Sequence, residues 1–354
     1  MWCRFLYNYI AEKRRMIIDF RSDTVTKPTQ EMLKAMMNAN VGDDVFGEDP
    51  SINELEKLSA DMFGMEAGLF CPSGTMTNQI AIKCHTQPGD EVICDESAHV
   101  YQYEGGGIAF NSSASVKLLY GDRGRINAEQ IKISINADDN HKAHTSLVCL
   151  ENTSNRGGGS CYDFEEIKKI KEVCTDNGLA LHLDGARLWN ALIAKNETPL
   201  QYGQTFDSIS ICLSKGLGSP AGSVLIGKKD LIKKARRIRK VFGGGMRQGG
   251  FLAAAGMYAL KNNIERLKQD HEHAKQIGDT LNKSSIARSV LPIETNIIIF
   301  ETNNNTTANA IVEKLKEKEI LCYAIAPDRV RFVIHLDISE QMINNTIEII
   351  KNLK

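Results

Sequence analysis

The stretch that decides the fold class of this chain is LALHLDGARLWN, residues 179–190. It begins with an apolar run that ends at Asp184, and Arg187 follows on the next turn. Similar short runs occur elsewhere, at 67–71, 91–94, 115–119, 146–150, 208–213 and 223–226. Most of them are apolar throughout and do not alternate with polar residues. This pattern is typical of strands that are buried on both faces in a parallel sheet covered by helices.

Helical patterns fill the intervals between these runs. Asp49 is placed to cap a helix whose first residue is Pro50, a second helix follows the turn at 73–75, and a third covers about 163–176. Because strands alternate with helices, the sequence predicts an α/β fold with a mostly parallel, seven-stranded sheet and helices on both faces.

The length of 354 residues favours two domains. A polar helical stretch near 262–283 is followed by a new set of elements: strand 297–300, helix 307–318, strand 320–324, strand 329–334 and a final helix. We therefore expect a large domain over 65–265 and a smaller α/β domain over 266–354. No flexible linker separates them, so a long helix is expected to join the two.

Composition argues against several partners. The formal net charge is -1, which gives no electrostatic reason to expect nucleic acid or an acidic membrane. The basic run 228–240 is interpreted as a solvated helix face, with nucleic-acid binding as the alternative. No apolar run approaches the ~20 residues that span a bilayer. The stretch 1–15 lacks the order of a secretory signal, and we expect either a disordered extension or a misassigned start, with Met16 as the alternative first residue.

Cysteine usage indicates a reducing, cytoplasmic compartment. The nine cysteines show no spacing typical of metal ligands, so no metal site is predicted. Cys94, Cys149 and Cys212 lie inside apolar runs and are expected to act as small core residues.

Two charged residues stand directly after apolar runs. Lys215 follows ISICL within SKGLGSP (214–220), where partial desolvation would keep its amine neutral enough to attack a carbonyl. The alternative is a solvated turn lysine. Asp184 ends its strand, and a buried carboxylate there needs a cationic partner such as a protonated pyridine nitrogen. The alternative is a helix cap.

Two further motifs follow strands in the same way. CPSGTMTNQ (71–79) runs from a strand through a glycine turn into a helix, where the helix N-terminus and the hydroxyls of Ser73 and Thr75 would bind phosphate. DESAHVYQYEGGG (95–107) places His99 where it would stack on an aromatic ring or move protons. An ordinary cap and a core histidine are the respective alternatives. Ligands of open α/β sheets bind outside the carboxyl ends of the strands, so the four motifs together favour one site.

In these motifs the chain resembles the low-specificity threonine aldolases, a branch of the fold-type-I enzymes that use pyridoxal 5'-phosphate (PLP). The resemblance extends from Ile18 to the C-terminus. It rests on DFRSDTVTKP (19–28), VGDDVFGEDP (41–50), PSGTMTNQ (72–79), AHVYQYEGGG (98–107), LENT (150–153), HLDGARLWNA (182–191), ISICLSKGLGSPAGS (209–223), GGGMRQGG (243–250) and VRFVIHLD (330–337).

The resemblance assigns cofactor roles to residues at the strand ends. It implies that Lys215 carries PLP as a Schiff base, that Asp184 contacts the pyridine nitrogen and that His99 stacks on the ring. The phosphate would be held by Ser73, Gly74 and Thr75. The large domain, 65–265, would then be the PLP-binding domain.

The resemblance also implies substrate and subunit contacts. The amino-acid carboxylate would be bound by Ser22, Arg187 and Arg331, with Arg187 also beside the cofactor, since an arginine fork matches a carboxylate. Tyr103 and His141 would lie near the substrate hydroxyl. Residues that reach a neighbouring subunit's site would be Lys240 and Arg247, which implies a homodimer or homotetramer in which 16–64 packs on the small domain and at the subunit interface.

The implied reaction is retro-aldol cleavage of L-threonine or L-allo-threonine to glycine and acetaldehyde. The catalytic base is left open between His99, His141 and a water that they hold. The alternatives are β-elimination or transamination on the same fold, or a non-catalytic α/β binding protein that has lost its cofactor. Ser154 departs from the family, which often has histidine there, so the substrate preference is not fixed by the resemblance.

Overall fold

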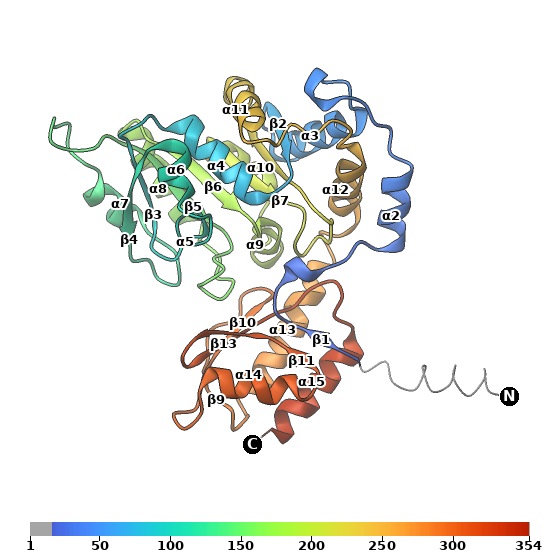
Figure 1. Ribbon diagram of the computed structural model, residues 1–354. Helices are drawn as coiled ribbons and strands as arrows, with labels where there is room; N and C mark the ends of the chain where they lie inside the picture. The colour runs from blue at the N-terminus through green and yellow to red at the C-terminus, as the bar shows by residue number, and fades with distance from the viewer. Residues whose placement is uncertain (1–15, 354) are drawn as a thin grey trace.

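The computed structural model describes residues 16–353, and the expectation for 1–15 lies outside them (Figure 1). Seven strands form the central sheet in the order β2-β8-β7-β6-β5-β3-β4. Their bounds are β2 (Ala67–Cys71), β3 (Glu91–Asp95), β4 (Ser115–Leu119), β5 (Thr145–Glu151), β6 (Ala180–Gly185), β7 (Ser208–Cys212) and β8 (Ser223–Gly227). All neighbours are parallel except β8, which is antiparallel to both β2 and β7. The predicted sheet is confirmed.

Helices cover both faces of this sheet. The main ones are α2 (Gln30–Met37), α3 (Pro50–Phe63), α4 (Gly74–His85), α5 (His99–Gln102), α6 (Gly107–Ser112), α7 (Ala128–Ser134), α8 (Phe164–Asp176), α9 (Leu188–Lys195), α10 (Pro199–Thr205), α11 (Lys229–Val241) and α12 (Gly250–Asn262). The expected caps are present: Asp49 and Ser73 accept hydrogen bonds from the first turns of α3 and α4. Helices α4, α6 and α11 pack on one face, and α3, α8, α10 and α12 pack on the other.

Side chains along β6 alternate between the two faces of the sheet, and this alternation decides to which face the polar residues of LALHLDGARLWN point. Leu181 and Leu183 belong to the apolar cluster under α8, whereas His182 and Asp184 point to the face that carries α4. Successive residues of a strand point to opposite faces. The run LALHL therefore buries a histidine on the α4 side although most of its residues are apolar.

The C-terminal part, from α13 (Leu267–Leu281) onward, has a four-stranded antiparallel sheet in the order β12-β13-β10-β9. Its strands are β9 (Ala287–Val290), β10 (Ile297–Thr302), β12 (Tyr323–Ala326) and β13 (Arg329–Val333), with helices α14 (Ala308–Lys316) and α15 (Glu340–Asn352). Two expectations need correction. The single strand expected at 320–324 is divided into β11 (Ile320–Leu321) and β12, because β11 pairs with β1 (Ile18–Asp19) while β12 pairs with β13. The long joining helix is interrupted at 263–266 between α12 and α13.

The N-terminal segment belongs to the C-terminal part in space. Figure 1 shows β1 among the orange and red elements, and Ile18 and Phe20 are buried in the apolar cluster formed with α13, α14 and α15. The ring of Phe20 stacks on Phe332 of β13 at a centroid distance of 5.2 Å. None of the described helices combines the length and the apolarity needed to span a membrane.

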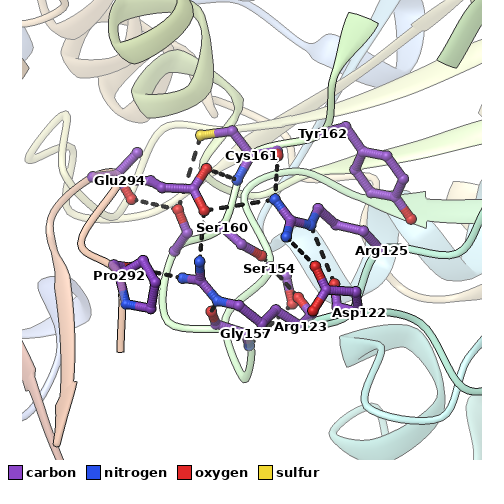
Figure 2. Close-up of polar contacts among 12 residues, drawn as sticks. Asp122, Arg123, Arg125, Ser154, Gly157, Ser160, Cys161, Tyr162, Pro292 and Glu294 are labelled. Carbon is purple, nitrogen blue, oxygen red and sulfur yellow. Dashed lines mark hydrogen bonds and ion pairs between the residues drawn. The ribbon is translucent and has the colours of Figure 1, made fainter. Parts of the chain in front are cut away.

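A polar cluster around Glu294 joins the C-terminal part to loops of the large sheet (Figure 2). Glu294 accepts hydrogen bonds from Arg123 Nη1, at 2.7 Å, and from the backbone of Cys161, at 3.0 Å. Ser154 lies in the same cluster, where its Oγ accepts a hydrogen bond from the backbone N–H of Gly157. A Cβ added at Gly124 would clash with this hydroxyl. The side chain at 154, where the family often has histidine, is thus enclosed in the loop.

Candidate active site

A cavity of about 310 Å³ lies at the carboxyl ends of the parallel strands. It brings together most of the residues that the sequence predicted for cofactor binding. Its lining residues are Pro72, Ser73, Gly74, Thr75, Asn78, His99, Asp184, Ala186, Ser210, Cys212, Ser214, Lys215, Pro220 and Ala221. These residues come from the segments that follow β2, β3, β6 and β7 and from α4, so their proximity depends on the strand order.

Lys215 lies in the turn that follows β7. Its backbone oxygen accepts hydrogen bonds from Gly218 N, at 2.9 Å, and from Thr26 Oγ1, at 3.1 Å. The turn is therefore fixed from within and from the N-terminal segment, and it presents the lysine side chain to the cavity.

The start of α4 forms a cradle that suits a phosphate. Ser73 caps the helix. A Cβ added at Gly74 would lie 3.3 Å from Ser223 Oγ, so glycine at this position keeps the space between α4 and Ser223 open. Ser223 Oγ is buried and has no hydrogen-bond partner among the described residues. Free N–H groups at a helix N-terminus, together with an unpaired hydroxyl nearby, match the oxygens of a phosphate.

Asp184 has the surroundings expected of a partner for a cation. It is 3% exposed, and its two oxygens accept hydrogen bonds from Asn78 Nδ2, at 2.9 Å, and from the backbone of Ala186, at 3.0 Å. Among the described residues it forms no ion pair. A buried carboxylate that accepts hydrogen bonds from neutral donors fits a protonated pyridine nitrogen as its cationic partner. With the cradle and Lys215, the residues present fit PLP.

His99 is a further residue of the cavity lining. Its Nδ1 lies 2.9 Å from Glu104 Oε1, and its ring centroid is 5.7 Å from that of Tyr103. Burial lowers the pKa of His99, but the hydrogen bond with Glu104 and the charges of Asp184 and Glu104 outweigh burial and raise it above its ordinary value. The geometry leaves Nε2 as the nitrogen available to a ligand.

Glu151 is a buried carboxylate that the sequence analysis did not single out. It ends β5 beside Asp184 in the sheet, and it accepts backbone hydrogen bonds from His99, at 2.8 Å, and Asn155, at 2.9 Å. Burial, with the neighbouring charge of Asp184, raises the pKa of Glu151 to about 7. Glu151 thus fixes the loops that follow β3 and β5.

The fork of Arg187 has a different partner from the one expected. Its Nε and Nη2 donate to the two oxygens of Asp23, each at 2.7 Å. Both side chains are buried. Asp23 occupies Nε and one N–H of Nη2, which leaves the other N–H groups of the guanidinium, so contact of Arg187 with a substrate carboxylate remains a prediction.

Arg331 has no acidic partner among the described residues. Its Nη1 donates to Asn155 Oδ1 and its Nη2 to the backbone oxygen of Arg21, whereas its buried Nε has no partner among the described residues. Burial and the like charge of Arg187 lower the pKa of Arg331 to about 10. A bound carboxylate would relieve both effects. Ser22 is adjacent to Asp23 in the sequence, and its Oγ accepts a hydrogen bond from the backbone N–H of Thr24.

Three predicted residues are not brought to the cavity of their own chain. His141 precedes β5, whose other end carries Glu151, and its side chain is 93% exposed and contacts Asp139. Lys240 ends α11 on the surface, and Arg247 pairs with Asp43. His141 does not reach the cavity of its own chain, and its role near the substrate remains a prediction. Contacts of Lys240 and Arg247 with another subunit remain a prediction.

Asp23, Asn78, Glu104 and Glu151 are the site residues that sequence reasoning missed. Glu151 carried a usable signal, since it ends the apolar run SLVCL just as Asp184 ends LALHL. Asp23 and Glu104 lie inside quoted motifs, but nothing local distinguishes them from solvated acids. Asn78 is one more polar residue of a helix, and its role depends on partners far away in sequence.

The chain matches known proteins over most of its length. The family model for the beta-eliminating lyases matches residues 19–305. The low specificity L-threonine aldolase of Escherichia coli O157:H7 is 42% identical over 328 residues, which cover 92% of this chain and 96% of the relative. The low-specificity L-threonine aldolase 1 of Arabidopsis thaliana is 41% identical, covering 93% and 94%. A solved structure of Leishmania major threonine aldolase shares the fold, with a TM-score of 0.84, 22% identity and coverage of 95% and 99%.

Proposed function

Because the chain belongs to the low-specificity L-threonine aldolase family of beta-eliminating lyases, we propose that it is a PLP-dependent carbon–carbon lyase that cleaves L-threonine and L-allo-threonine to glycine and acetaldehyde. The observation that carries this proposal is the meeting of Lys215, Asp184 and His99 in one cavity beside the α4 cradle. These groups come from three separate strand ends, and together they suit one cofactor.

The cofactor would be held at three points. Lys215 would provide the amine that binds the cofactor, Asp184 would pair with its ring nitrogen, and the start of α4, with Ser73, Gly74 and Thr75, would hold its phosphate. When bound, PLP supplies an electron sink for the electron pair released by breaking the Cα–Cβ bond. The share of the protein is to orient the substrate and to move its protons.

Arg331 is the residue that we propose to bind the substrate carboxylate. Its unpaired Nε and its lowered pKa both favour an anion at this place. Arg187 and Asp23 form the wall beside it, and their mutual pairing leaves Arg331 to bind the ligand. Ser22 and Tyr103 remain candidate substrate contacts at the edge of the site.

His99 is the proposed base for the β-hydroxyl proton. With Nδ1–H donating to Glu104, the lone pair of Nε2 is free to accept a proton. The raised pKa makes this nitrogen a stronger base than an isolated imidazole. After cleavage, the same nitrogen would return a proton.

We further propose the predicted organisation of the chain and its assembly. Separate apolar clusters support a large domain over 65–265 and a small one over 266–354, with 16–64 packing on the small domain and at the subunit interface. The exposed Lys240 and Arg247 support a homodimer or homotetramer that shares active sites. Among the described residues, the eight cysteines are buried and form no disulfide, which supports the cytoplasm as the compartment. Active protein is expected to sediment as a dimer or larger, and a fully active monomer would refute shared sites.

The experiment that tests the function measures products. Purified protein should be yellow and should release acetaldehyde and glycine from threonine and allo-threonine, more rapidly with added PLP. Serine and phenylserine serve as comparison substrates. Release of ammonia and a keto acid without aldehyde would instead indicate β-elimination, the reaction that gives the matching family model its name. Colourless protein that fails to bind PLP would overturn the proposal.

A further inference from the structure

One asparagine of α4 bridges the two carboxylates of the candidate site. Asn78 is 2% exposed, and its Nδ2 donates to Asp184 Oδ2 and to Glu104 Oε1, each at 2.9 Å. Asp184 faces the cavity, and Glu104 holds His99 Nδ1 at 2.9 Å. A single amide therefore contacts both the carboxylate proposed for the cofactor and the carboxylate that supports the proposed base.

Behind Asn78, further hydrogen bonds cross the sheet. Asn78 Oδ1 lies 3.2 Å from His182 Nε2, and His182 Nδ1 lies 2.8 Å from Ser208 Oγ on the neighbouring strand β7. Ser208 Oγ in turn lies 2.9 Å from Nε2 of His85, at the end of α4. The series thus begins and ends on α4 and passes through β6 and β7.

The chemistry of the partners leaves one arrangement of protons. Both partners of Asn78 Nδ2 are carboxylates, which accept and do not donate, so the amide nitrogen must face them and its oxygen must face His182. His182 then carries its proton on Nε2, and its Nδ1 accepts from the hydroxyl of Ser208. That hydroxyl has a single proton, so His85 must donate to it from Nε2.

Burial keeps both histidines of the series neutral. Burial lowers the pKa of His182 to about 3 and that of His85 to about 4. At neutral pH neither ring gains a second proton, and the order of donors and acceptors does not change. Every hydrogen bond in the series therefore donates toward the two carboxylates, and such chains polarise one another.

We propose that Asn78 is a positioning residue that holds Asp184 and the Glu104–His99 pair in one geometry and one charge state, and that His182 and Ser208 keep its amide in the required orientation. This inference rests on the proposed function, because it gives Asp184 and His99 their roles. It adds residues that touch neither the substrate nor the cofactor's reacting atoms.

The main test replaces Asn78 with leucine, which has nearly the same shape and no donor. Both carboxylates would then hold a proton more tightly, because each loses a hydrogen bond to its charged form. One such bond corresponds to about one to two pH units. We expect the acidic limb of the pH profile of kcat/KM to move upward by that amount, and the pH dependence of the visible spectrum of bound PLP to shift as well. Turnover should fall about tenfold to a hundredfold.

The adjacent glutamine provides a matched control. Gln79 Nε2 donates to Glu104 Oε2 at 2.7 Å, and no hydrogen bond joins it to Asp184 among the described residues. Gln79→Met should therefore move the acidic limb while leaving the cofactor spectrum in place. Of these two substitutions, only that of Asn78 should move both the acidic limb and the cofactor spectrum. The ionisable groups around His99 are Glu104, Glu151, Asp184, Tyr103 and Lys215.

The supporting role of His182 has its own pair of variants. His182→Gln keeps an N–H donor near the position of Nε2 and should retain most of the wild-type behaviour. His182→Leu removes the donor and should reproduce the Asn78→Leu shifts in weaker form. If both variants show the same spectrum and pH profile as the wild type, His182 does not orient Asn78.

The outcome that would overturn the proposal is an Asn78→Leu protein that binds PLP with an unchanged spectrum and an unchanged pH limb, even if its melting temperature is lower. If the Asn78→Leu variant does not fold, Asn78→Ser is the replacement test. The serine hydroxyl has one proton, which can be donated to only one of the two carboxylates. The spectral measurement needs no substrate. A wild type that binds PLP but does not cleave threonine would therefore refute the proposed function while leaving this inference testable.

Discussion

Arg187 donates hydrogen bonds from Nε and Nη2 to the two carboxylate oxygens of Asp23, both at 2.7 Å, and the two side chains are 5% and 0% exposed. The pair joins the turn after β6 to the N-terminal segment that also contacts Lys215 through Thr26. The pair therefore fixes the turn that carries Arg187 against the N-terminal segment, whereas the buried Nε of Arg331 has no partner among the described residues.

Asp23→Asn should destabilise the protein by about 3–5 kcal/mol, because it leaves the charge of Arg187 buried without a partner. Urea unfolding measures this change. Asp19→Asn is the matched control: Asp19 pairs with Arg21 near the surface, where such a pair is worth less than about 1 kcal/mol. Equal losses in the two variants would contradict a special role for the buried pair.

The same pair predicts a sensitivity to acid. Burial raises the pKa of Asp23, but the charge and hydrogen bonds of Arg187 outweigh burial and hold it below the ordinary value of 3.8. A lowered pKa means that this contribution to stability is present above about pH 4 and is lost as the pH falls. The stability advantage of the wild type over Asp23→Asn should therefore shrink below pH 4, as unfolding curves at several pH values would show.

Arg331→Ala should lower kcat/KM for threonine by about one to two powers of ten, since a hydrogen bond to a charged group is worth ~1.5–3 kcal/mol. Arg331→Lys should recover part of the loss, because lysine restores the charge without the fork. The visible absorbance of bound cofactor should not change. Arg329→Ala, on the same strand but paired with Glu301 at the surface, is the control that should leave kcat/KM unaltered. An unchanged KM in Arg331→Ala would place the carboxylate elsewhere.

Lys215→Ala should lose the visible absorbance and nearly all turnover while keeping its fold. The reason is that the backbone of residue 215, rather than its side chain, makes the hydrogen bonds that fix the turn. Absorbance after borohydride reduction measures covalently held cofactor. Lys228→Ala, at an exposed lysine, is the control. A Lys215→Ala protein that still retains cofactor after reduction would show that another amine carries it.

Glu151→Gln tests the buried carboxylate at the end of β5. The pKa of Glu151 is raised from 4.5 to about 7, so the folded state binds this proton more tightly than the unfolded state does. Its contribution to stability is complete below pH 4.5 and is lost as the pH rises through 7. The wild type should accordingly lose roughly 3 kcal/mol relative to Glu151→Gln between pH 4.5 and pH 8, measured by urea unfolding. A constant difference across this range would mean that Glu151 is charged throughout.

Much of the fold was determined by local sequence. Most of the seven strands of the large sheet are short apolar runs, and a strand that is buried on both faces can be recognised from its own residues without knowledge of its neighbours. Caps such as Asp49 and Ser73 act within a single turn, so their helices were also predictable. The ends of the runs placed Lys215, Asp184 and His99 at one edge of the sheet, because parallel strands have their carboxyl ends on the same side.

Only the tertiary structure decided which charged groups meet. Arg187 and Asp23 are 164 positions apart, and Asn78 and Asp184 are 106 positions apart. Such contacts depend on strand order and on the face to which each side chain points, and neither property is written in a local pattern. The same reason separates His141 from the cavity: it lies at the amino end of β5, and six residues of extended strand carry the chain to the other edge of the sheet before Glu151. The sequence thus determined the elements and the reactive residues at their ends, while the packing of the strands decided the partners that set the charge of each one.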